Sequence, residues 1–158
     1  MKLWFNLLCR DMEAQMRFYQ ALLGWQEAEA SRSPIYRALE SEGVQFGFNA
    51  QPAYALLALE DRAPVPTLAA PVTAYATFML PTPDAVDDVA DRVGALGGRV
   101  IRMPYATYYG QWQAVLTDPE QHVFRISAHT LPSGAVAAPH PGGRGAPPLG
   151  ATSDAPTS

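Results

Sequence analysis

The sequence predicts an α+β fold built from two βαβββ modules that follow one another along the chain. A strand-like run followed by a helical pattern occurs twice, about 70 residues apart. Each helical pattern stops at glycine, and three short strand-like stretches follow each stop. Hydrophobic residues make up 48% of the chain, which is enough for a packed core. An internal duplication of this kind indicates the architecture before any single motif is considered.

The first module begins with an apolar run over residues 3–9 and continues into an amphipathic helix. Asp11 is the expected N-cap, and Glu13 lies near the positive end of the helix dipole. Gly24 is the expected stop. Apolar residues recur at the spacing of one helix face and predict a buried stripe, which consists of Met12, Met16, Phe18, Tyr19, Leu22 and Leu23.

Three further strands complete the first module. Their expected ranges are residues 25–30, 35–41 and 44–49. Glu42 and Gly43 form a two-residue turn between the last two of these strands. The apolar alternation of these runs therefore predicts a hairpin that packs against the first helix.

The second module repeats this order. Its first strand is expected at residues 75–80, and its helix begins after Pro83 and ends at Gly97 and Gly98. Val86, Val89, Val93 and Leu96 form the apolar face of that helix. The later strands are expected at residues 99–103, 111–117 and 123–128, with a turn at 118–122 and a tyrosine-rich loop at 105–110.

Composition divides the chain into one domain and a tail. The domain is expected to span residues 1–129, with modules at 1–50 and 74–129 joined by the proline-containing connector 51–73. Residues 130–158 are rich in glycine, proline, alanine and serine. Such a segment buries too little apolar surface to offset its chain entropy, so a flexible tail is expected.

Charge and cysteine content exclude several classes of function. The net charge of −4 argues against a nucleic-acid partner, because phosphate binding needs a basic surface. The single cysteine, Cys9, cannot form a disulfide framework within one chain. No apolar run approaches the roughly 18 residues that span a bilayer, and no signal peptide is recognisable. A cytoplasmic protein without a membrane partner is therefore expected.

Two local motifs carry a family resemblance. Arg10-Asp11-Met12-Glu13 leads to Phe18-Tyr19 in the first module, and Asp118-Pro119-Glu120 precedes an alternating strand in the second. With the duplication, these motifs resemble the vicinal oxygen chelate superfamily of glyoxalases, bleomycin-resistance proteins and extradiol dioxygenases. The resemblance covers roughly residues 1–129. It implies that the modules form a glyoxalase-like incomplete barrel around a cavity, often across two chains, so a homodimer is expected.

The resemblance also implies where a metal would lie. Enzymes of the superfamily hold a divalent cation with a histidine on the first strand of each half and a glutamate on a last strand. Here these positions hold Trp4, Tyr75 and Arg125. Arginine has no lone pair to offer a cation, so no metal and no other cofactor are expected. The three histidines, expected at the surface and off that face, are His122, His129 and His140.

Strand alternation predicts which side chains line the cavity. The expected binding residues are Trp4, Asn6, Tyr75, Tyr109, Gln113 and Arg125. Together they supply aromatic walls, amides and one guanidinium, which is typical of a small-molecule site. The guanidinium suits a carboxylate or phosphate through a bidentate contact. No catalytic residue is predicted, because helix and turn capping account for the acidic residues near these motifs.

Alternatives to this interpretation stay open. Trp4 and Tyr75 fit core packing as well as ligand contact, and Arg125 could pair with Glu40 or Glu42. The leading hypothesis is a metal-free protein that binds a small aromatic or anionic molecule, resembling the antibiotic-binding bleomycin-resistance proteins. The alternatives are a glyoxalase-like lyase or dioxygenase with an atypical metal site, and a dimer-forming protein without a ligand.

Overall fold

The computed structural model describes residues 2–65 and 71–141 and contains the two βαβββ modules. The first module consists of β1 (Leu3–Leu8), α1 (Met12–Leu23), β2 (Gln26–Glu27), β3 (Tyr36–Ser41) and β4 (Val44–Asn49). The second consists of β5 (Ala76–Leu80), α3 (Pro83–Val93), β6 (Arg99–Ala106), β7 (Trp112–Thr117) and β8 (Val123–Ala128). The predicted fold class is confirmed.

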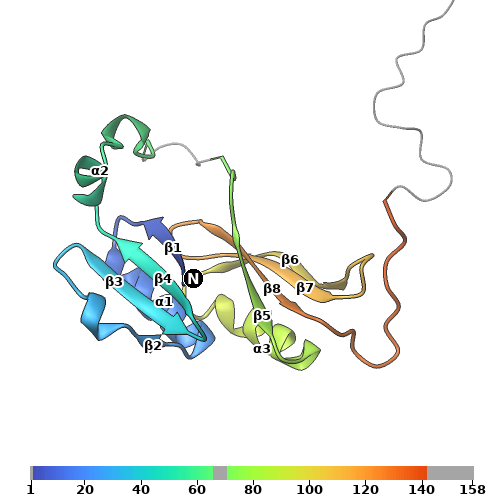
Figure 1. The fold of residues 1–158 in the computed structure, drawn as a ribbon. Coiled ribbons are helices and arrows are strands. Elements are labelled where there is room, and N and C mark those ends of the chain that lie inside the picture. Colours follow the sequence, from blue (N-terminus) through green and yellow to red (C-terminus); the bar gives the residue numbers. More distant parts are fainter. Residues whose placement is uncertain (1, 66–70, 142–158) are drawn as a thin grey trace, which may run out of the picture.

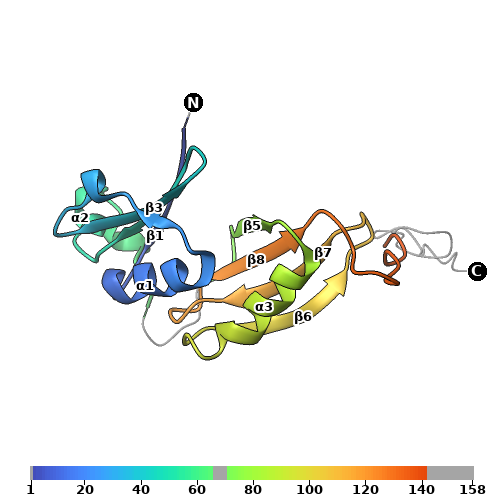
Figure 2. The same cartoon turned by 90° about the horizontal axis from the view of Figure 1, so that it is seen from below.

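The two sheets have the same topology. The strand orders are β1-β4-β3-β2 and β5-β8-β7-β6, so the first strand of each module lies at an edge. In each sheet the first strand is parallel to the last, and the other pairs are antiparallel. Figure 1 shows the two modules beside each other, and Figure 2 shows α1 and α3 on the same side of the molecule.

Local signals explain where the helices begin and end. The Asp11 carboxylate accepts a hydrogen bond from the backbone N–H of Ala14 at 2.9 Å, as expected for the N-cap of α1. Gly24 ends this helix in the left-handed conformation, with φ of 70°. In α3 the cap is Thr82, whose hydroxyl accepts from the Ala85 N–H at 3.2 Å.

One hydrophobic core joins the modules. Tyr19 of α1 is almost completely buried, and its ring lies against rings of both modules: Phe46 and Phe48 of β4, Phe78 of β5 and Phe124 of β8. Edge-to-face and offset contacts of this kind add to the free energy of burying each ring. The two modules therefore share their most buried aromatic residues.

Two strands differ from their predicted lengths. β2 is limited to Gln26–Glu27, because Glu29–Ser31 forms a 3-10 turn, η1. β6 extends to Ala106, which pairs with Trp112 of β7. Two register shifts along β6 accommodate the extra residues. Tyr105, which the sequence placed in a loop, therefore belongs to the sheet.

The connector forms a short helix, α2 (Ala53–Leu56), and a 3-10 turn, η2 (Glu60–Arg62). Residues 130–141 of the predicted tail are described. In this segment the Ala138 N–H donates to the Thr107 carbonyl at 3.2 Å. Residues 142–158 lie outside the described ranges, so tail flexibility stays a prediction. None of the helices within residues 2–65 and 71–141 has the length and apolarity needed to cross a membrane.

Candidate functional site

Arg125 lies on β8, on the face of the second sheet turned away from α3. Its Nε donates to the Thr77 hydroxyl of β5 at 3.0 Å, and one terminal nitrogen lies 3.5 Å from the Tyr109 hydroxyl. The guanidinium carbon is 4.9 Å from the centre of the Tyr75 ring. The alternative pairing with Glu40 or Glu42 is wrong: within the described residues Arg125 forms no ion pair with either, and the Glu40 carboxylate binds Lys2 at 3.1 Å. Arg125 is thus held by neutral groups.

A buried amide fixes two tyrosines beside this arginine. Gln113 of β7 is only 3% exposed. Its nitrogen donates to the Tyr105 hydroxyl, and its oxygen accepts from the Tyr109 hydroxyl at 2.8 Å. Because both ends of the amide are bonded, Gln113 holds the two phenols in fixed positions.

A second arginine completes this region. The Arg102 guanidinium carbon lies 3.4 Å from the centre of the Tyr105 ring, at the irregular part of β6. A cavity of about 280 Å³, called the arginine cavity below, is lined by both arginines and by the three hydrogen-bonded residues Tyr105, Gln113 and Tyr109. Its other lining residues are Ala106, Thr107, Tyr108, Ala138, Pro139 and Pro141. No carboxylate of the described chain lines this cavity.

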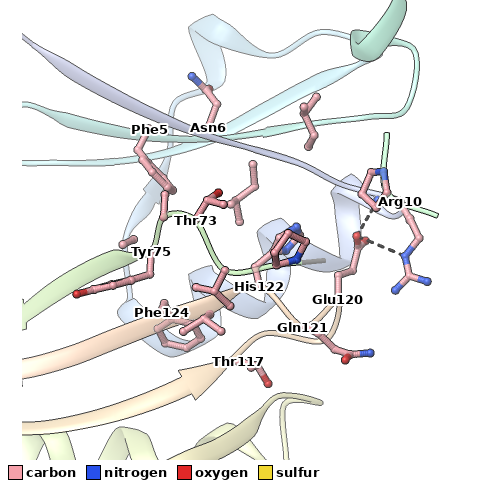
Figure 3. Close-up of a pocket in the computed structure, with 18 of the residues that line it drawn as sticks. Phe5, Asn6, Arg10, Thr73, Tyr75, Thr117, Glu120, Gln121, His122 and Phe124 are labelled. Atoms are coloured by element: carbon pink, nitrogen blue, oxygen red, sulfur yellow. Dashed lines mark hydrogen bonds and ion pairs between the residues drawn. The ribbon is translucent and has the colours of Figure 1, made fainter. Parts of the chain in front are cut away.

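A larger cavity, of about 920 Å³, lies between the modules and is called the junction cavity below. Its walls come from β1, from the segment before β5 and from the turn between β7 and β8. Figure 3 shows His122 in this cavity, with Phe5 and Asn6 on one side and Phe124 on the other. The histidine was expected at the surface; its side chain is half-buried, with 31% exposed, and lines this cavity.

The six predicted binding residues do not all meet. Tyr109, Gln113 and Arg125 line the arginine cavity. Asn6 and Tyr75 line the junction cavity, although the Tyr75 ring also faces Arg125. Trp4 is 53% exposed and lines neither cavity.

On the first sheet, Asn6 is engaged by a neighbouring tyrosine. The Tyr36 hydroxyl donates to its side-chain oxygen at 3.2 Å. This contact crosses over Gly47, where a β-carbon would clash with both groups. The absence of a side chain at Gly47 therefore allows the two polar groups to meet above the sheet.

The donor set at the superfamily's metal positions does not fit a cation. Trp4 and Arg125 offer no ligand atom, and Tyr75 alone cannot form a site. Within the described residues, no group of three or more His, Cys, Asp or Glu side chains could hold a metal ion. The residues at these three positions therefore do not fit a metal ion.

Sequence reasoning missed two sets of residues. Arg102 and Tyr105 were overlooked because the register shifts of β6 have no clear signature in the sequence. His122, Asp118 and Tyr19 were treated separately, as a turn and a helix stripe. The available signal was the combination of a histidine four residues after an aspartate in a tight turn, which brings the two side chains together.

Comparisons with known proteins agree with this fold. The family model described as a glyoxalase-like domain matches residues 3–127. A glyoxalase/bleomycin resistance protein/dioxygenase family enzyme from Burkholderia phytofirmans PsJN is 39% identical, with a TM-score of 0.73; the match covers 79% of this chain and 95% of that one. A comparison with curated proteins gave no significant match.

More distant structures show the fold alone. A glyoxalase-related enzyme from Fulvimarina pelagi is 20% identical with a TM-score of 0.63, and the match covers 81% of this chain and 87% of that chain. A lactoylglutathione lyase from Agrobacterium tumefaciens is 18% identical with a TM-score of 0.59, and the match covers 81% of this chain and 92% of that chain. The family match over most of the domain is decisive: the chain belongs to the glyoxalase-like domain family of the vicinal oxygen chelate superfamily, in the glyoxalase/bleomycin resistance/dioxygenase group.

Proposed function

We propose that the protein binds a small aromatic molecule with a carboxylate or phosphate group in the arginine cavity. The observation that carries this proposal is the presence of Arg102 and Arg125 in one cavity that no described carboxylate lines. Two guanidiniums that no described carboxylate pairs with favour an anion, since each can donate paired hydrogen bonds to its oxygens. Tyr105 and Tyr109 supply ring faces for the aromatic part.

The geometry also supports a fixed orientation of the ligand. Gln113 holds both tyrosine hydroxyls, and Thr77 holds Nε of Arg125. Within the described residues, the terminal nitrogens of Arg125 make one hydrogen bond, at 3.5 Å to the Tyr109 hydroxyl, and otherwise remain available as donors. A site held in place before binding loses less entropy when the ligand arrives.

Isothermal titration calorimetry with benzoate and phenyl phosphate tests the proposal. The double variant Arg102→Gln/Arg125→Gln should bind both probes at least about tenfold more weakly, because charge-assisted hydrogen bonds are lost. Arg99→Gln is the matched control, since Arg99 lies on the same strand but does not line the cavity. Equal affinities for the double variant and the control would contradict the proposal.

The roles of Trp4 and Asn6 in ligand binding remain predictions, as does a homodimer, which sedimentation equilibrium can test. A glyoxalase-like lyase or dioxygenase is the alternative function within this family. It requires side chains that can hold a metal ion together. The described residues contain no such group of three or more His, Cys, Asp or Glu side chains. Stoichiometric nickel, zinc, iron or manganese in the purified protein would favour this alternative.

A further inference from the structure

The junction cavity contains a polar cluster that the proposed function does not use. Tyr19 and His122 line this cavity, and Asp118 lies directly behind them. Aromatic side chains form much of the surrounding wall, from Phe5, Tyr54, Tyr75 and Phe124. A mostly apolar cavity with a few converging polar groups is the usual form of a small-molecule site.

Asp118 is the anchor of the cluster. The residue is only 2% exposed. Its Oδ1 accepts from the backbone N–H groups of Glu120 and His122 at 2.9 and 3.0 Å. Its Oδ2 lies 3.0 Å from the Tyr19 hydroxyl and 2.9 Å from Nδ1 of His122. Four donors therefore hold the carboxylate in one position against the histidine.

This contact determines which ring nitrogen of His122 faces the ligand. A carboxylate oxygen accepts hydrogen bonds, so the proton of the neutral ring lies on Nδ1. Nε2 then carries a lone pair, and no hydrogen bond joins it to any residue of the described chain. The side chain of Gln15, which is buried on α1, lies 3.4 Å from Nδ1 and packs against the ring. With the Nδ1 proton directed at Asp118, this approach of the amide nitrogen is a packing contact and not a hydrogen bond.

The charges around the ring make it a stronger base. Burial by itself lowers the pKa of His122, but the hydrogen bond to Asp118 and the charges of Asp118 and Glu120 outweigh burial and raise it. Arg10 opposes this rise, and its own side chain lies 3.6 Å from the Glu120 carboxylate. A proton that reaches Nε2 is thus stabilised by the carboxylate behind the ring.

We propose that the junction cavity is a second binding site, which takes a neutral aromatic molecule with an acidic hydroxyl group and accepts its proton on His122. The ligand O–H donates to Nε2 of the ring. When the proton transfers, the O–H bond breaks, an N–H bond forms at Nε2, and a phenolate remains beside the imidazolium. No other reactant is needed.

The charges distinguish this ligand from that of the arginine cavity. Asp118 and Glu120 place two carboxylates beside the ring and Arg10 places one guanidinium there, so the net negative charge disfavours a molecule that arrives already ionised. A neutral hydroxyl donor meets no such repulsion. The two cavities therefore select opposite forms of an acid, the ionised form at Arg102 and Arg125 and the protonated form at His122.

A spectrophotometric titration with 4-nitrophenol tests this proposal, since the absorbance of the probe reports its ionisation. The titration is made in the Arg102→Gln/Arg125→Gln background, so that failure of the arginine cavity does not affect the result. His122→Asn is the test variant. Its amide nitrogen takes the place of Nδ1 and keeps the contact with Asp118, but nothing replaces Nε2.

We expect His122→Asn to bind 4-nitrophenol at least about tenfold more weakly, whereas 4-nitroanisole, which lacks the hydroxyl, should bind both proteins equally. His129→Asn makes the same substitution at a histidine that lines neither cavity, and should retain binding. Circular dichroism shows whether each variant is folded. Three results would each overturn the proposal. The first is an unchanged affinity of His122→Asn for 4-nitrophenol, and the second is an equal loss of affinity for 4-nitroanisole. The third is that the background protein does not bind 4-nitrophenol. Nitrogen-15 shifts that place the proton of the neutral ring on Nε2 would overturn it as well.

Discussion

The arginines of the two modules have different surroundings although the sheets share one topology. In the first module, Arg37 is 13% exposed and contacts both Glu27 and Glu13, and Arg32 donates to Glu27 at 2.7 Å. In the second, Arg102 and Arg125 lie against tyrosine rings in a cavity that no described carboxylate lines. Acidic partners from the same module neutralise Arg32 and Arg37, whereas no described carboxylate lines the cavity around Arg102 and Arg125. Under the proposed function, the comparison teaches that a repeated fold can use its arginines for stability in one half and for ligand binding in the other.

The open faces of the sheets differ in the same way. On the first sheet, Asn6 and Tyr36 bond to each other across Gly47. On the second, Gln113 bonds to two tyrosines that border a cavity. Polar groups that satisfy each other leave little for a ligand, whereas groups arranged around a cavity can contact one.

The largest expected effect comes from Glu27→Gln, which should lower the free energy of unfolding by about 2 kcal/mol near pH 7. Hydrogen bonds from Arg37 and Arg32 lower the pKa of Glu27 from 4.5 to about 2. A lowered pKa gives stability that is fully present above the unfolded value and is lost as the pH falls through the folded value. Urea denaturation should therefore show a difference in the free energy of unfolding between the unsubstituted protein and Glu27→Gln. This difference should be constant above pH 4.5 and disappear toward pH 2.

This variant also tests the comparison itself. Glu27 lines neither cavity, so Glu27→Gln should bind benzoate like the unsubstituted protein. Arg125→Gln should do the reverse, losing affinity with little loss of stability. If Glu27→Gln weakened benzoate binding as much as Arg125→Gln, the proposed division between the modules would be wrong.

A smaller effect is expected for Gly47→Ala. The added methyl group would displace the Asn6 and Tyr36 side chains and cost about 1–2 kcal/mol of unfolding free energy. Gly94→Ala is the matched control in the second module, because its backbone is helical and nothing lies within 4 Å of the added carbon. This control should be neutral or stabilising by about 0.5 kcal/mol. Thermal denaturation of the pair checks both values, and equal melting temperatures would contradict the contact across Gly47.

The smallest effect concerns Tyr109→Phe. Loss of the hydroxyl removes the 2.8 Å bond to Gln113 and should lower benzoate affinity about fivefold, with about 1 kcal/mol of lost stability. Tyr36→Phe makes the same chemical change on a tyrosine of β3 that lines neither cavity, and should leave benzoate affinity within about twofold. If calorimetry finds the same benzoate affinity for the two variants, the hydrogen bond between Gln113 and Tyr109 has no role in the proposed site.

Much of the fold could be predicted because its signals are local. Asp11 and Gly24 bound the first helix as expected, and Glu42 and Gly43 both adopt positive φ in the predicted turn. Strand alternation also identified Gln113 and Arg125 as residues of one face. These features depend on residues close in the chain or on the period of a strand.

The missing parts depend on long-range contacts. His122 packs against Gln15, which lies 107 residues away, and Asp118 accepts a hydrogen bond from Tyr19 across 99 residues. No periodicity links such positions. The register shifts of β6, which bring Arg102 into the cavity, depend on pairing with β7 and not on the residues of β6 alone.

The turn between β7 and β8 has a consequence for how the chain folds. The Glu120 carboxylate accepts hydrogen bonds from the backbone N–H groups of Arg10 and Asp11, at 2.8 and 2.7 Å, across 110 and 109 residues. The amino end of α1 is thus completed by a residue from the other module, where a negative charge stabilises exposed N–H groups. The first module cannot acquire this contact until the last hairpin has formed, so cooperativity extends across both halves. We expect the domain to unfold in one transition, with neither half reaching its full stability alone.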